Sequence, residues 1–150
     1  MNTTTENHEK CIDVCNSLLR GERSAVETYE KAIEKFSGET SSGTLQELHK
    51  THVRAVGILE ENVRSMGGTP DSESGAWGTF ANAVQSTANL FGEESAVTAL
   101  QQGEKHGERE YEDALENEDV MPECKNLIRT ELLPNVISNI ATLETLEEIV

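Results

Sequence analysis

The chain has 150 residues, 28 Asp and Glu against 12 Lys and Arg, and a formal net charge of −16. A surface this negative repels nucleic acid and anionic membranes, so we expect no partner of either kind. Only 4% of the residues are aromatic, which favours a small aliphatic core between helices over a sheet sandwich. The length suits one domain with a real core.

The first helix is expected over residues 9–36, after a polar and flexible tail formed by residues 1–8. Ser37-Gly38 ends it, because glycine tolerates the left-handed conformation in which many helices stop. The segment Thr44-Leu45-Gln46-Glu47 has the form of a capping box. It predicts the start of a second helix, which runs to about residue 66 and is stopped by the glycines at 67 and 68.

Residues 71–75 are expected to form a loop, and residues 76–90 a short amphipathic helix carrying Trp77 and Phe80. A third helix is predicted over residues 93–117. A fourth follows over residues 122–148, with Pro122 in its first turn and Pro134 kinking it locally. Two antiparallel hairpins joined by a long crossover is a standard connectivity of four-helix bundles. We therefore expect residues 9–150 to form a single all-α domain.

The first and third helices share a repeated pattern. Glu22, preceded by glycine and followed after six residues by Tyr29, recurs as Glu104 and Tyr111 with the same neighbours. Each glutamate interrupts an apolar helical stripe, and each tyrosine lies two turns further along the same face. A carboxylate in such a stripe needs a partner. The repeat predicts a duplicated helical hairpin with two interior carboxylates at equivalent levels.

These Glu-x6-Tyr helices resemble the carboxylate helices of the ferritin-like superfamily, which includes bacterioferritin and rubrerythrin. The glycine-rich end of the second helix, the crossover with Trp77 and the segment Gln102-Gly103-Glu104 resemble a bacterial branch of uncharacterised ferritin-like proteins. The resemblance implies a ferritin-like four-helix bundle with a short extra helix in its crossover. It also implies a homo-oligomer, a dimer or larger, assembled through bundle faces.

Ferritin-like di-iron sites use one Glu from each of two helices and a Glu-x-x-His pair from each of the other two. Glu22 and Glu104 meet the first requirement. The second helix has His52 where the resemblance places a Glu, and the fourth has Glu131-x-x-Pro134 without a histidine. We therefore do not expect a complete di-iron enzyme centre.

A reduced metal site is still compatible with the sequence. Glu22, Glu104 and Glu131 would supply carboxylates and His52 an imidazole, a mixture that suits Fe, Mn or Zn without choosing among them. Tyr29 and Tyr111 would orient the carboxylates. The alternative is a buried polar layer without a cation, in which Glu22 and Glu104 are bonded to the tyrosines and His52 and fix the helix register.

The leading hypothesis is therefore a ferritin-like bundle with a metal-binding or stress-related, non-catalytic role. A structural or interaction module is the second hypothesis, and a di-iron oxidase or peroxidase the third. The chain has no amino-terminal apolar run and no apolar stretch of about 18 residues, which predicts a cytoplasmic protein without a membrane span. Its cysteines, Cys11, Cys15 and Cys124, are expected to be reduced and buried. Cys11 and Cys15 lie one turn apart and are either small apolar packing residues of the core or two metal ligands. The packing role is favoured.

Overall fold

The computed structural model describes residues 2–75 and 92–150, with side chains described from His8 onward. Over these ranges the chain forms helices α1 (Asn2–Lys35), α2 (Ser42–Ser65) and α4 (Glu93–Glu116). A fourth helical segment consists of α5 (Pro122–Leu127), the π-helical turn η1 (Ile128–Leu132) and α6 (Leu133–Ile149). The described ranges contain no strand. The expected short helix over residues 76–90, with Trp77 and Phe80, lies outside the described residues.

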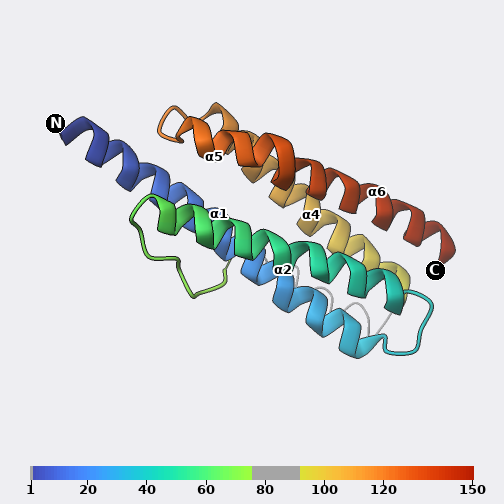
Figure 1. Cartoon of the computed structure of the whole chain (residues 1–150). Helices are drawn as coiled ribbons and strands as arrows, with labels where there is room; N and C mark the ends of the chain where they lie inside the picture. Colours follow the sequence, from blue (N-terminus) through green and yellow to red (C-terminus); the bar gives the residue numbers. More distant parts are fainter. Residues whose placement is uncertain (1, 76–91) are drawn as a thin grey trace.

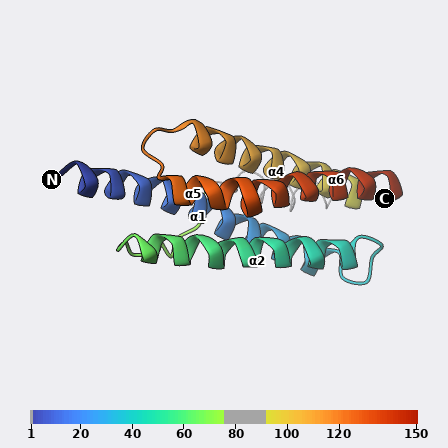
Figure 2. The same cartoon turned by 45° about the horizontal axis from the view of Figure 1, so that its top comes forward.

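The helices pair as two antiparallel hairpins. The most extensive helix–helix contacts are those of α1 with α2 and of α4 with α6, and α1 also packs against α4. Figures 1 and 2 show all four helical segments lying alongside one another. The all-α architecture of two hairpins joined by a long connection is thus confirmed. Within the described ranges, no helix is long and apolar enough to cross a membrane.

Two helix starts differ from the sequence-based prediction. Helix α1 begins at Asn2, so residues 2–8, predicted as a flexible tail, are helical. Helix α2 begins at Ser42, before Thr44, and its N-cap residue Ser41 makes no side-chain capping bond. The predicted capping box therefore does not form. The start of α2 is held by a tertiary contact instead: the Ser41 backbone N–H donates to Glu93 Oε2 of α4 at 2.9 Å.

The glycines that were expected to stop the helices do so. Gly38 and Gly67 have φ values of 82° and 83°, a left-handed conformation that costs glycine little. Gly92 also has a positive φ, 83°, but it is the N-cap residue at the start of α4. Gly68 has a different role, since a Cβ atom there would lie 2.8 Å from Ile12 Cγ2. The turn after α2 therefore packs against α1 with no room for a side chain.

Pro134 does not break the fourth helical segment. Proline lacks the amide hydrogen, and its ring excludes the carbonyl four residues earlier. The chain accommodates it with the π-helical turn η1, which directly precedes α6 and Pro134. The helix continues through this turn, so the predicted local distortion takes the form of a π turn.

The core has two apolar clusters, and on α1, α2 and α4 a buried polar residue separates them in the sequence. One cluster includes Cys15, Leu59 and Ile128, and the other includes Ala32, Leu48 and Leu143. Between these stretches lie the buried polar side chains Glu22, His52 and Glu104, and Asn139 of α6 is buried near the same level. These polar residues form the layer described next.

Candidate functional site

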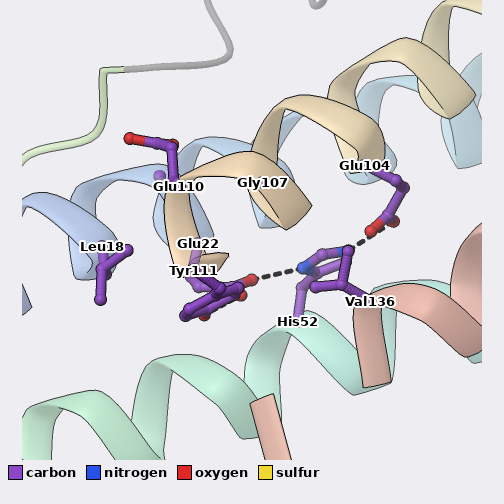
Figure 3. A pocket seen from close by; sticks show the side chains of 9 residues that line it. Leu18, Glu22, His52, Glu104, Gly107, Glu110, Tyr111 and Val136 are labelled. Atoms are coloured by element: carbon purple, nitrogen blue, oxygen red, sulfur yellow. Dashed lines mark hydrogen bonds and ion pairs between the residues drawn. The ribbon is translucent and has the colours of Figure 1, made fainter. Parts of the chain in front are cut away.

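Three helices bring two glutamates and one histidine into direct contact. His52 of α2 lies between Glu22 of α1 and Glu104 of α4 (Figure 3). Its Nδ1 is hydrogen-bonded to Glu22 Oε1, and its Nε2 lies 2.7 Å from Glu104 Oε2. Glu22, His52 and Glu104 are 6%, 3% and 0% exposed. The structure thus brings together three of the four residues that we predicted as ligands.

The two tyrosines bind the two glutamates reciprocally. The Tyr29 hydroxyl donates to Glu104 Oε2 at 2.5 Å, and the Tyr111 hydroxyl donates to Glu22 Oε2 at 2.6 Å. Residue 22 of α1 therefore faces residue 111 of α4, and residue 29 faces residue 104, as antiparallel helices require. The equal Glu-to-Tyr spacing in both helices makes this exchange possible. Burial raises the pKa of both hydroxyls well above 10.0, and the glutamates raise it further, so both tyrosines remain neutral donors.

The environment favours a charged His52. Burial disfavours the imidazolium and is the largest single effect, but the charges of Glu104 and Glu22 and the hydrogen bonds to them together outweigh it. The pKa of His52 therefore lies well above its ordinary value of 6.5. As an imidazolium, His52 donates from both ring nitrogens. Its ring also stacks on that of Tyr29, with centroids 5.3 Å apart.

The charges and hydrogen bonds of this layer do not balance. Two carboxylates face a single imidazolium, which leaves one negative charge in a buried site. Glu104 Oε1 is buried and has no hydrogen-bond partner in the part of the chain that the structure describes. An unpaired buried charged group is costly, so this oxygen marks a place where a further donor or a cation would be stabilising.

A small cavity adjoins the layer. Glu22, His52 and Glu104 line it. The space that the centre of a water-sized sphere can occupy is about 10 Å³, which is close to the minimum for one water molecule. Gly107 also lines it, and a Cβ atom built there would meet nothing within 4 Å. Glu110 lines the same cavity, and its partial burial raises the pKa of its carboxyl group.

The sequence did not identify two residues near this site. Glu110 directly precedes Tyr111 and lies in an acidic run, a pattern that is more typical of a solvated helix face. Asn139 of α6 is buried, with its Nδ2 3.5 Å from His52 Nε2 and 2.9 Å from Thr51 Oγ1. Its place on the apolar face of the fourth helix was the available signal.

Glu131 lies elsewhere, although we expected it to supply a third carboxylate. Its Oε1 accepts a hydrogen bond from Arg54 Nη2 at 2.7 Å, in a partly exposed ion pair. The reason is its position in η1, where the neighbouring apolar residues Ile128 and Leu132 take the buried side. The structure therefore does not bring Glu131 to Glu22, His52 and Glu104.

The donor set does not fit a di-iron centre. Such centres use four carboxylates and two histidines, whereas this layer offers two carboxylates, one histidine and the amide of Asn139. The layer therefore lacks the ligands that a di-iron centre requires. Carboxylate and imidazole ligands on three facing helices suit a single cation better.

Comparison with known proteins defines the class and the family. One solved structure, described as a ferritin-like, diiron-carboxylate protein from Bacillus anthracis str. Ames, superposes with a TM-score of 0.59 at 20% identity. The match covers 95% of this chain and 93% of that chain, and shows that the fold is ferritin-like. Residues 10–117 match the family described as "Domain of unknown function (DUF2383)", and the chain belongs to this family. The comparison with curated proteins gave no match.

Proposed function

We propose that this protein is a ferritin-like metal-binding bundle that holds one divalent cation at Glu22, His52 and Glu104 without catalysing a reaction. The supporting observation is the unbalanced buried layer, in which Glu104 Oε1 has no partner among the described residues. If a divalent cation displaces one proton of the His52 imidazolium, the neutral imidazole and two carboxylates face two positive charges, and the site becomes neutral.

The surrounding residues would orient the ligands. Tyr29 and Tyr111 each hold one carboxylate oxygen through their hydroxyl groups, as residues behind a metal ligand commonly do. One ring nitrogen of His52 would bind the cation. Oxygen and imidazole ligands suit Mn, Fe and Zn. The cation must replace a proton on His52, so binding should weaken as the pH falls.

A second function has an observation of its own. In the metal-free layer, both ring nitrogens of His52 and both tyrosine hydroxyls are hydrogen-bonded to the glutamates. This arrangement alone fixes the relative register of α1, α2 and α4. The protein would then be a structural or interaction module in which the imidazolium takes the place of a metal. A di-iron oxidase or peroxidase has the least support, because the donor set does not fit.

The remaining predictions extend this proposal. A homo-oligomer formed through bundle faces, a cytoplasmic location and a stress-related role would suit a bundle that keeps a reactive cation away from solvent. They rest on the resemblance and on the composition of the chain.

Manganese loading separates the two functions. Mn²⁺ is a suitable probe because it prefers oxygen and imidazole to thiolate ligands. The protein is purified without an affinity-tag metal, treated with chelator, loaded with Mn²⁺ and freed of excess metal. Bound Mn is then measured by mass spectrometry, and electron paramagnetic resonance checks that it is held by the protein.

The matched variants are Glu22→Gln/Glu104→Gln and, as a surface control, Glu131→Gln. We expect about one Mn per chain for wild type and the control, and less than about 0.1 for the double variant. Less than about 0.1 Mn per wild-type chain would exclude the cation site and favour the structural layer.

A further inference from the structure

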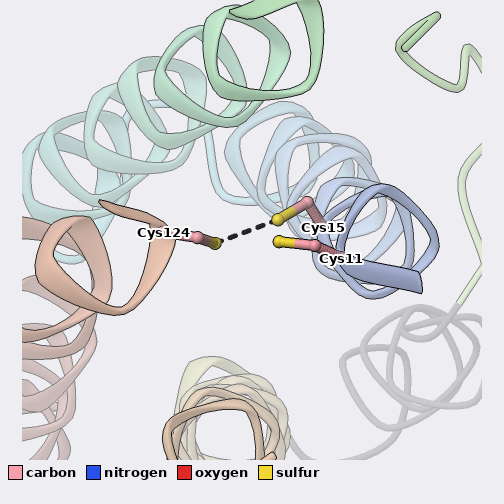
Figure 4. Close-up of side chains that lie close together, drawn as sticks. All are labelled: Cys11, Cys15 and Cys124. Carbon is pink, nitrogen blue, oxygen red and sulfur yellow. Dashed lines mark hydrogen bonds between the residues drawn. The ribbon is translucent and has the colours of Figure 1, made fainter. Parts of the chain in front are cut away.

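A second cluster of ligand-type side chains lies in the apolar core. Cys11 and Cys15 of α1 face Cys124 of α5, and the three sulfur atoms all lie within 4.8 Å of one another (Figure 4). The Sγ atoms of Cys15 and Cys124 are only 2.9 Å apart, although 109 positions separate them in the chain. All three side chains are buried, with at most 1% exposed. The tertiary structure thus adds a third thiol to the pair seen in the sequence.

The polar groups near these sulfurs are hydrogen-bond donors. The Met121 backbone N–H donates to Cys11 Sγ at 3.3 Å, and Asn62 Nδ2 donates to Cys15 Sγ at 3.3 Å. The three cysteines also belong to an apolar core cluster that includes Leu59 and Val120. Donors to sulfur stabilise thiolates, and N–H···S bonds commonly surround metal-bound cysteines.

The three thiols shift one another's pKa values in opposite directions. Hydrogen bonds from Cys124 and Cys15 lower the pKa of Cys11 well below 9.0, helped by the Met121 N–H and the charge of His8. The hydrogen bonding with Cys11 raises the pKa of Cys15, and it raises that of Cys124 to about 12.

We propose that Cys11, Cys15 and Cys124 form a binding site for a thiophilic cation, Zn²⁺ or Cu(I). Three sulfur ligands in an apolar pocket favour these ions over Mn²⁺ or Mg²⁺. Each thiol loses its proton to solvent on binding, and the cation keeps its oxidation state. Zn–S bonds of about 2.3 Å place tetrahedral sulfurs about 3.8 Å apart, so Cys15 and Cys124 must rotate slightly away from each other.

This site is separate from the carboxylate layer. Cys15 precedes Glu22 by two helical turns on α1, which corresponds to about 10 Å along the helix axis. The donors also differ, because sulfur is a soft ligand and carboxylate oxygen a hard one. The two proposals can therefore fail independently.

His8 distinguishes the two candidate cations. It lies one turn before Cys11 on the same side of α1, is half-buried and acts electrostatically on Cys11. Structural zinc sites have four ligands, and three cysteines with one histidine is a common set. Zn²⁺ would recruit His8 as the fourth ligand, whereas Cu(I) would be held by the three thiolates alone.

Co²⁺ is the spectroscopic probe for the zinc arm of the test. Full-length protein is prepared under argon with a non-thiol reductant and titrated with Co²⁺. We expect thiolate-to-cobalt absorption that saturates at about one equivalent and is abolished by Zn²⁺. For the copper arm, the protein should remove Cu(I) from a chromophoric Cu(I) chelator. If the site binds zinc, His8→Ala should weaken Co²⁺ and Zn²⁺ binding at least tenfold. The same variant should leave Cu(I) binding unchanged.

The variants connect the signal to these residues. Cys15→Ser and Cys124→Ser should lose the absorption and the Cu(I) uptake, with helicity checked by circular dichroism. Glu104→Gln should retain both, which separates this site from the carboxylate layer. X-ray absorption of metal-loaded wild-type protein requires no variant, and should show sulfur at about 2.3 Å from the metal.

Three results would overturn the proposal. The first is wild-type protein that shows neither the cobalt absorption nor Cu(I) uptake. The second is an X-ray absorption spectrum of metal-loaded protein that shows only oxygen and nitrogen neighbours of the metal. The third is a Cys15–Cys124 disulfide in protein prepared under argon, which would identify these thiols as a redox pair instead.

Discussion

Removing the His52 side chain should destabilise the metal-free protein more than any single change at the surface. His52→Ala leaves Glu22 and Glu104, which are 6% and 0% exposed, without the only cation that contacts them among the described residues. Breaking a buried ion pair by removing one partner costs about 3–5 kcal/mol. For a chain of 150 residues, this corresponds to a fall in Tm of about 6–20 °C.

The assay is urea unfolding in the presence of chelator, followed by the helical circular dichroism signal. His49→Ala is the matched control, because His49 lies one turn earlier on α2 and pairs with Glu30 at the surface. The control should change the free energy of unfolding by less than about 0.5 kcal/mol. Adding Glu22→Gln and Glu104→Gln to His52→Ala should restore part of the loss, because the unpaired charges are removed. A loss below about 1 kcal/mol for His52→Ala, or an equal loss for the control, would refute the reasoning.

Three further predictions concern the glycines, Glu131 and pH. Gly68→Ala should lower the free energy of unfolding by about 1–3 kcal/mol, because its Cβ would overlap the side chains of α1 and α2. Gly57→Ala, where the Cβ meets nothing within 4 Å, should raise it by about 0.5–1 kcal/mol. Urea unfolding of both variants checks the pair, and similar effects of the two would contradict the packing argument. Glu131→Gln should change stability by less than about 0.5 kcal/mol, because its pair with Arg54 is partly exposed. A loss of bound Mn in that variant would show that Glu131 is a ligand after all. The folded-state pKa of His52 is raised above 6.5, so its stabilising charge is fully present below that pH and is lost as the pH rises through the folded-state pKa. In chelator-treated protein the urea midpoint should therefore fall between about pH 7 and about pH 9, and a steady rise over that range would argue against a charged His52.

The sequence predicted the helices and the two interior glutamates because these features have local causes. Apolar residues at helical spacing and the glycines at 38, 67 and 92 determine where helices form and end. The repeated Glu-x6-Tyr spacing placed Glu22 and Glu104 on buried faces, and a buried carboxylate requires a partner wherever it lies. The alternative of a layer bonded to both tyrosines and His52 also followed from these requirements.

Only the tertiary structure decided which side chains meet. The antiparallel contact of α1 with α4 makes each tyrosine bind the glutamate of the other helix. The π turn before Pro134 directs Glu131 to Arg54 instead of the layer, and the packing of α5 on α1 brings Cys124 to the other two cysteines. Helical spacing determines which residues share a face of one helix. The contacts between faces depend on how the helices pack, which residues distant in the chain decide together.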